Sequence, residues 1–325
     1  MHNFSKLLVA TGLLACAALP VAAQYPSKPI TIISAFSAGG DSDLSARNLG
    51  QHAAKYLNNQ PIVVINRVGA SGAIGSSVVR NAAPDGYTLL VARIASHAIL
   101  PAMDTKTPYK YNDFTMLSVL ETNPYACVVK GDSPYKTMPE LLDDIRKNPG
   151  KLNFSTSGVG TVQNLGVQYL MTLVGLTKDH AVGIHYKSGG EVTTSLLGGQ
   201  VQFACNNLNT LVSHIKAGTF RALMIAMPQR LPELPNVPTA REFGLPEMER
   251  IVGWTALVGP PNMAKDAVDK WVEVLGKLAN DPDWLAGNVK ISGIPAIRSS
   301  ADTAAFFNDQ YDLYYGLAVK LGIRE

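Results

Sequence analysis

Short apolar runs alternate with segments of helical spacing along most of the chain. The runs are nearly continuous in Val, Ile, Leu and Ala, which is typical of strands that are covered on both faces. They predict strands at Ile30–Ser34, Ile62–Asn66, Thr88–Ala92, Ala126–Lys130, Asn153–Ser157, Ile184–Lys187, Val201–Cys205, Ala222–Met227 and Thr255–Gly259.

Helical patterns separate these runs. Thr137 and Glu140 stand three residues apart, as in a capping box that opens a helix. Gly218 follows a short helical pattern at the position where a left-handed residue ends a helix, and a long final helix follows Ser300. The alternation predicts an α/β protein with mostly parallel sheets. About nine strands in a chain of 325 residues fit two small sheets better than one large sheet.

The first 23 residues have the layout of a secretory signal peptide. Lys6 precedes an apolar stretch, and Val21–Ala23 places small or branched residues before an expected cleavage at Gln24. An uncleaved membrane anchor is disfavoured by Pro20 and by the short length of the run. A lipoprotein site at Cys16 is a further alternative.

Composition and charge narrow the function classes. The chain is 46% hydrophobic and 16% charged, with 28 basic and 25 acidic side chains. These values exclude a fibre, a multi-span membrane protein and a disulfide scaffold, and the absence of a Lys/Arg cluster disfavours nucleic-acid binding. No Walker A, HExxH or GxSxG motif occurs, and we expect neither a cofactor nor a metal. After export, Cys127 and Cys205 would either pair or remain simple buried residues.

Two loops have the composition of anion-binding sites. The first, at 34–43, follows a predicted strand and contains Gly39 and Gly40 before a helix. The second, at 154–163, follows another predicted strand and again combines Ser, Thr and Gly before a helix. Helix N-termini and small residues allow backbone N–H groups to approach a carboxylate or phosphate. Ordinary glycine turns are the alternative for each loop, but two such loops favour a ligand held between two lobes.

The order of motifs along the chain resembles that of the solute-binding receptors of tripartite tricarboxylate transporters, the Bug family. The resemblance runs from Tyr25 to about the last helix, and the ordered set is specific although each motif alone is weak. The motifs are Tyr25–Pro29, Gly39–Gly40 with Asp43, Asn66–Gly72, Ala83–Leu90, Asn148–Phe154, His185–Lys187, Leu196–Val201, Arg221–Leu223 and Leu234–Thr239.

The resemblance implies a two-lobed, Venus-flytrap-like periplasmic binding protein that is not an enzyme. Lobe 1 would comprise residues 24–123 and 253–325, and lobe 2 residues 124–252, each with a mainly parallel sheet and flanking helices. A small organic carboxylate would lie between the lobes, held by the two loops. By position, the loop residues implied are Ser37, Ala38, Gly39, Asp43, Ser155, Ser157, Gly158, Gly160, Thr161 and Gln163.

Departures from the family pattern bear on the ligand. Arg93 follows a strand where the family usually has small residues. A guanidinium there would either pair with a second ligand carboxylate or turn to solvent or to an acidic neighbour. Asn206 and Asn207 stand where the family often has an Asp-Asn pair, which disfavours a ligand ammonium group; the alternative is that they only cap the following helix. Aromatic residues beside the loops would form a slot for a ring or pack into the core; these are Phe36, Phe154, Tyr186 and Trp254.

The resulting hypothesis is a dicarboxylate receptor, with an aromatic dicarboxylate such as terephthalate as one ligand. It would deliver the solute to the membrane permease of a tripartite tricarboxylate transporter. The alternatives are a sensory protein for the same solute and, less favoured, an exported enzyme with Asp43 or His185 as a base.

Overall fold

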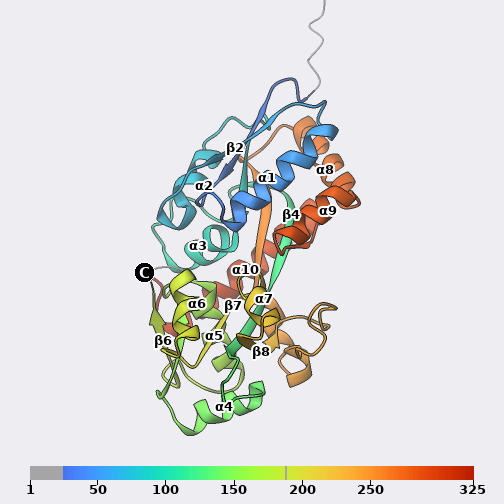
Figure 1. Cartoon of the computed structure of the whole chain (residues 1–325). Helices are drawn as coiled ribbons and strands as arrows, with labels where there is room; N and C mark the ends of the chain where they lie inside the picture. Colours follow the sequence, from blue (N-terminus) through green and yellow to red (C-terminus); the bar gives the residue numbers. More distant parts are fainter. Residues whose placement is uncertain (1–24, 187–188) are drawn as a thin grey trace, which may run out of the picture.

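The computed structural model describes residues 25–186 and 189–325, and the expected signal peptide lies outside these ranges. Within them, ten strands form one curled sheet that helices flank on its faces (Figure 1). The α/β class is confirmed, but the strands join in one sheet and not in the two small sheets that the sequence favoured, because β4 pairs in both parts of it. The strands are β1 (Ile30–Ser34), β2 (Ile62–Asn66), β3 (Thr88–Arg93), β4 (Thr115–Lys130), β5 (Leu152–Thr156), β6 (Ala181–His185), β7 (Phe203–Asn207), β8 (Phe220–Ile225), β9 (Val252–Gly259) and β10 (Ile294–Pro295).

The capping box and the final helix are confirmed. Thr137 accepts a hydrogen bond from the N–H of Glu140, whose carboxylate accepts from the N–H of Thr137. The α-helices are α1 (Asp41–Ala53), α2 (Ala73–Arg80), α3 (Leu100–Met103), α4 (Met138–Lys147), α5 (Val162–Leu173), α6 (Gly189–Leu197), α7 (Val212–Lys216), α8 (Lys265–Leu278), α9 (Pro282–Lys290) and α10 (Ser300–Leu321). None of these described helices is both long enough and apolar enough to cross a membrane.

The sheet is parallel toward its two ends and antiparallel in its centre. Strands β2, β1 and β3 pair in parallel, as do β6, β5 and β7. Between them, β9 and β4 run antiparallel to their neighbours. The antiparallel pairing of these central strands differs from the mostly parallel sheets that were expected. It arises because β4 and β9 carry the chain between the two parallel groups in opposite directions.

Strand β4 is the longest strand of the described part and changes partners midway. Residues 115–124 pair with β9, and residues 125–130 pair with β7 and β8. The change falls at Pro124, which has no N–H to donate to a ladder. Figure 1 shows β4 running from the part of the molecule with α1 and α8 into the part with α5 and α7. These parts correspond to the lobes expected from the sequence, whose boundaries stay a prediction.

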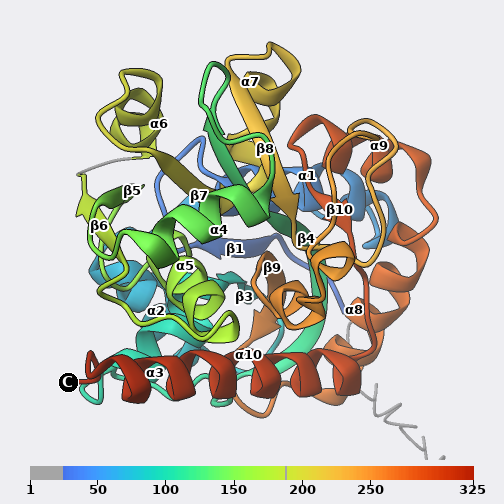
Figure 2. The same ribbon diagram turned by 90° about the horizontal axis from the view of Figure 1, so that it is seen from below.

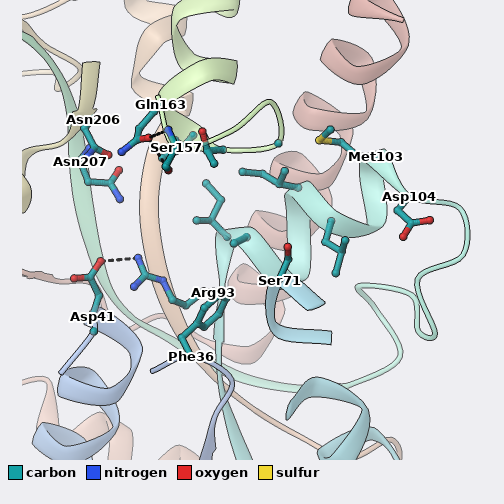
Figure 3. Close-up of a pocket in the computed structure, with 18 of the residues that line it drawn as sticks. Phe36, Asp41, Ser71, Arg93, Met103, Asp104, Ser157, Gln163, Asn206 and Asn207 are labelled. Carbon is teal, nitrogen blue, oxygen red and sulfur yellow. Dashed lines mark hydrogen bonds and ion pairs between the residues drawn. The ribbon is translucent and has the colours of Figure 1, made fainter. Parts of the chain in front are cut away.

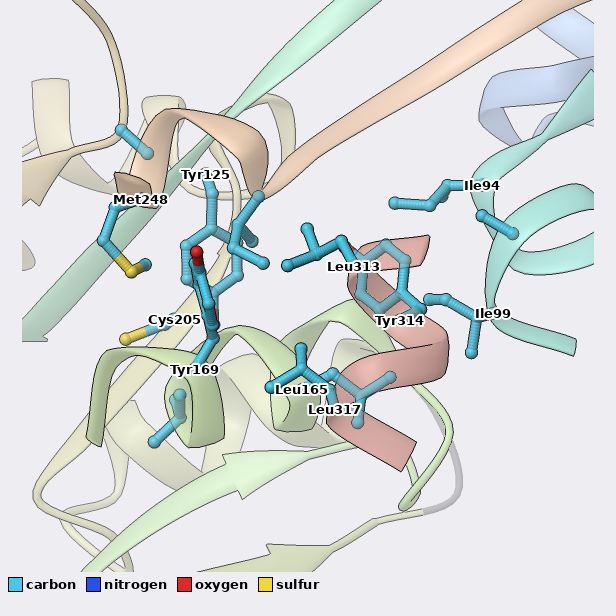
Figure 4. Close-up of a cluster of buried hydrophobic side chains, with 14 of the residues drawn as sticks. Ile94, Ile99, Tyr125, Leu165, Tyr169, Cys205, Met248, Leu313, Tyr314 and Leu317 are labelled. Carbon is cyan, nitrogen blue, oxygen red and sulfur yellow. The ribbon is translucent and has the colours of Figure 1, made fainter. Parts of the chain in front are cut away.

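Helix α10 packs against both parts. It contacts α3 and β4 as well as α5, and Figure 2 shows it running the width of the molecule. Its buried side chains Tyr314 and Leu317 belong to the same core cluster as Ile99 of the first part and Leu165 of the second (Figure 4). A continuous apolar core therefore joins the two parts behind the space between them.

Cys127 and Cys205 form a disulfide, one of the two outcomes that the sequence left open. They are opposite each other in the antiparallel pair of β4 and β7, with their Cα atoms 4.1 Å apart. The register of the two strands therefore places the two thiols in contact, and both residues are buried.

Candidate ligand-binding cleft

A cavity of about 820 Å³ lies where the two parts of the molecule face each other. This volume is within the range of about 300–1,000 Å³ that is usual for small-molecule sites. Figure 3 shows side chains from α1, β3, α3, the loop before α5 and the end of β7 turned toward it. The ligand site predicted between the two loops therefore coincides with a cavity, and both loops contribute to its wall.

The loop between β5 and α5 offers hydrogen-bond donors to the cavity. The Oε1 of Gln163 accepts hydrogen bonds from the N–H and the hydroxyl of Ser157, at 2.6 and 2.8 Å. This fixes the amide so that its Nε2 donor group points away from Ser157. Thr161 caps α5, and the first N–H groups of the helix have no carbonyl partner within it. The helix N-terminus and the amide together suit a carboxylate.

Asp43, in the first turn of α1, has a structural role. Its carboxylate accepts hydrogen bonds from the N–H of Gly39 and from the side chains of Arg47 and Asn66, each at 2.9 Å. The side chain is buried, which opposes ionisation, but these donors hold the pKa of Asp43 below its usual value. Asp43 therefore braces the loop and does not line the cavity.

Asp41, two residues earlier, does face the cavity. Its Oδ2 accepts a hydrogen bond from Nη2 of Arg93 at 2.8 Å (Figure 3). Its Oδ1 accepts one from Nδ2 of Asn209 at 3.1 Å. Burial disfavours the charged carboxylate, yet Arg93 and Asn209 outweigh it and lower the pKa of Asp41. Arg93 thus has an acidic neighbour, which is one of the two alternatives that the sequence left open.

A buried acid lies behind this ion pair. Glu121 of β4 is 1% exposed, and its Oε2 has no hydrogen-bond partner among the described residues. Burial raises its pKa to about 7, although the charge of Arg93 acts in the opposite direction. Glu121 does not line the cavity, so its role is in the packing of the crossing strands.

Nine of the fifteen site residues predicted from the sequence line the cavity and six do not. Those in the wall are Phe36, Ser37, Arg93, Ser157, Gly160, Thr161, Gln163, Asn206 and Asn207. Those outside it are Ala38, Gly39, Asp43, Ser155, Gly158 and Tyr186. The hydroxyl of Ser155 is buried and donates to the carbonyl of Val192, and the hydroxyl of Tyr186 lies 3.4 Å from Gln200. Phe154 and Trp254 are fully buried in the core.

One wall of the cavity was not predicted. Ile94, the π-helical turn Ala95–Ile99 and helix α3 follow Arg93 directly. They supply the apolar side chains of Ile94, Ile99, Leu100 and Met103 to the wall. The C-terminal segment adds Ile323 and Glu325, and the N–H of Glu325 donates to the carbonyl of Met103 at 2.8 Å. The apolar spacing after Arg93 was the available signal for the first group, whereas the second depends on tertiary folding.

A metal site is not supported by the one cluster of suitable side chains in the described ranges. His52, Asp281 and Asp283 bring ligand atoms within 4.8 Å of one another. However, Asp281 already accepts hydrogen bonds from Tyr56 at 2.7 Å and from the N–H groups of its own helix, and it pairs with Lys55 at 2.5 Å.

Comparisons with known proteins find similar sequences and structures over most of the chain. Residues 45–322 match the model of the tripartite tricarboxylate transporter family receptors. A UPF0065 protein of Agrobacterium vitis is 33% identical over 90% of this chain and 84% of its own. Protein BugT of Bordetella pertussis is 30% identical over 99% of each chain. The structure of MatC from Rhodopseudomonas palustris with bound malate is 26% identical, covers 90% of this chain and 100% of its own, and superposes with a TM-score of 0.74.

Proposed function

The chain belongs to the tripartite tricarboxylate transporter receptor family, the family that its ordered motifs indicated, and on this premise we propose that it captures a small organic dicarboxylate between its lobes. The members of this family are periplasmic solute-binding receptors and not enzymes. We place this chain in the periplasm after cleavage before Gln24. Its partner would be the membrane permease of a tripartite transporter.

The observation that carries the proposal is the chemistry of the two ends of the cavity. At one end, Gln163 and the N-terminus of α5 present donors that suit a carboxylate. At the other end, Arg93 is the single basic side chain in the described wall. Two such ends suit a ligand with a carboxylate at each. MatC, whose structure resembles that of this chain, has malate, a dicarboxylate, bound in its structure.

The apolar side chains in the cavity wall suit a carbon skeleton between the two carboxylates. Phe36, Ile99 and Met103 are among them, and apolar walls with few polar groups are usual for small-molecule sites. An aromatic ring would fit such a lining, so terephthalate belongs in the set of ligands to be tested beside aliphatic dicarboxylates.

The test is titration calorimetry on protein that has been unfolded, washed and refolded to remove bound solute. We expect one equivalent of a dicarboxylate to bind without conversion to a product, which chromatography of the recovered ligand checks. If no heat of binding is measured with any of the mono- and dicarboxylates, the proposal is contradicted. Turnover of the ligand would instead favour the enzyme alternative.

A pair of variants tests the α5 end. Gln163→Glu keeps an oxygen for Ser157 but replaces the Nε2 donor with a negative charge, so we expect affinity for a carboxylate to fall at least tenfold. Gln202→Glu is the control, because the Oε1 of Gln202 also accepts a backbone hydrogen bond, from Asn153 at 2.8 Å, but lies outside the cavity. Equal losses in both variants would remove Gln163 from the site.

A further inference from the structure

The charges in the cavity wall are mostly negative. Among the described residues that line it, Arg93 is the only base, whereas Asp41, Asp104 and Glu325 are acids. A dianionic ligand therefore meets one guanidinium and three carboxylates outside the α5 end. The position of the acids relative to Arg93 decides which of them affects the ligand.

Asp41 is paired with the guanidinium of Arg93, the group that we expect to bind the second carboxylate of the ligand. The Arg93–Asp41 pair is 2.8 Å long, and the side chains are 14% and 31% exposed, so the pair is shielded but open to the cavity. Asp41 is the first residue of α1, where the helix dipole stabilises an anion. Asn209, in the short helical turn Leu208–Thr210 of the other part of the molecule, donates to its other oxygen at 3.1 Å.

The rest of the β1–α1 loop offers few substitutes for Arg93. The N–H of Gly39 donates to Asp43, and the N–H of Gly40 donates to the carbonyl of Ser37. Glu121 approaches Arg93 from the buried side and does not line the cavity. A carboxylate that enters at this end would therefore compete chiefly with Asp41.

We infer that Asp41 is an internal competitor for Arg93 and thereby sets how strongly the cleft prefers dicarboxylates over monocarboxylates. This rests on the proposed function. The Asp41 carboxylate accepts hydrogen bonds from Arg93 and from Asn209 of the other part of the molecule. A dicarboxylate exchanges with or crowds this carboxylate, whereas a monocarboxylate bound at α5 leaves the pair in place. Asp41 would thus be a specificity-determining residue that lowers the affinity for the second carboxylate.

The test compares matched ligands on Asp41→Asn. The asparagine keeps an oxygen for Asn209 but carries no charge to hold the guanidinium. With calorimetry at constant ionic strength, we expect the affinity for succinate or terephthalate to rise at least tenfold over wild type. Affinity for butyrate or benzoate should change by less than threefold. In an Arg93→Ala background the gain should disappear, because the two residues act as one unit.

Asp104→Asn is the matched control. Asp104 lines the same cavity, but its carboxylate accepts from the N–H of Lys106 at 2.8 Å, so the variant removes the same charge without releasing Arg93. An equal gain in Asp104→Asn would show a general charge effect and overturn the inference. Weaker or unchanged dicarboxylate binding in a folded Asp41→Asn protein would also overturn it, while leaving the proposed function in place if wild type binds. If neither wild type nor the variant binds any of these ligands, both this inference and the proposed function are contradicted.

Discussion

Replacing the buried Glu121 with Gln should change how the stability of the protein depends on pH. The carboxyl lies in β4, in register with Thr255 of β9 and Pro295 of β10, and is 1% exposed. Burial raises its pKa from 4.5 to about 7, a value that Arg93 and Thr255 limit. A neutral amide of nearly the same shape does not titrate, so the variant isolates the cost of ionising this group.

The sign and size follow from proton linkage. The folded protein holds the Glu121 proton up to a higher pH than the unfolded chain, so the stability that it contributes is complete below pH 4.5 and is lost as pH rises to about 7. At about 1.4 kcal/mol for each tenfold change in proton affinity, the difference between 4.5 and about 7 corresponds to about 3 kcal/mol.

The assay is urea unfolding of wild type and Glu121→Gln at a series of pH values from 4 to about 8. His97 acts in the opposite direction over part of this range, because burial lowers its pKa to about 3, but its effect is common to both proteins. We therefore expect the free energy of unfolding of the variant, minus that of wild type, to increase by about 3 kcal/mol across the range. The argument would be refuted if the stability of Glu121→Gln and that of wild type depended on pH in the same way. Glu233→Gln changes an exposed position and is the control, for which we expect the same pH dependence as wild type.

Three further predictions follow from buried or closely packed groups. Burial holds the pKa of His97 at about 3, so wild type should lose stability as the pH falls from 6.5 toward 3, and His97→Phe should remove this loss. Acid unfolding followed by circular dichroism measures the effect, and the same acid transition in both proteins would contradict it. Replacing both Cys127 and Cys205 with Ala should lower the free energy of unfolding by about 2–4 kcal/mol, because the crosslink joins residues 78 positions apart. Reduction of the wild-type protein should lower it similarly in urea titrations. If neither change lowers it, the disulfide does not form in solution. Gly160→Val should weaken ligand binding at least tenfold in calorimetry, because even a Cβ there would lie 3.0 Å from the sulfur of Met103 across the cleft, and unchanged affinity in a folded variant would exclude Gly160 from the site.

Much of the sheet could be predicted because its strands are uniform apolar runs. Ile30–Ser34 and Ile62–Asn66 are β1 and β2 to the residue. The first half of β4 was missed, since Ser118, Glu121 and Asn123 interrupt its apolar pattern although all three are buried. Their burial comes from the crossing with β9 and β10, which the local sequence does not encode.

The sequence predicted where the cleft lies better than it predicted which polar residues line it. Asp41 and Asp43 both stand at the start of α1, and the family resemblance pointed to Asp43 as the site residue. Two residues of an α-helix turn the side chain by about 200°, so only one of them can face the cavity. The point at which the helix begins decides that Asp41 does. Likewise, the contact of Glu325 with Met103 joins distant segments and leaves no local signal.

The most direct test of the account is a crystal structure of the refolded protein with the dicarboxylate that binds it most tightly. We expect the ligand in the cavity between the lobes, with one carboxylate within hydrogen-bonding distance of Gln163 at the N-terminus of α5 and the other turned toward Arg93. A ligand bound outside this cavity, or one whose carboxylates contact neither residue, would contradict the central claim.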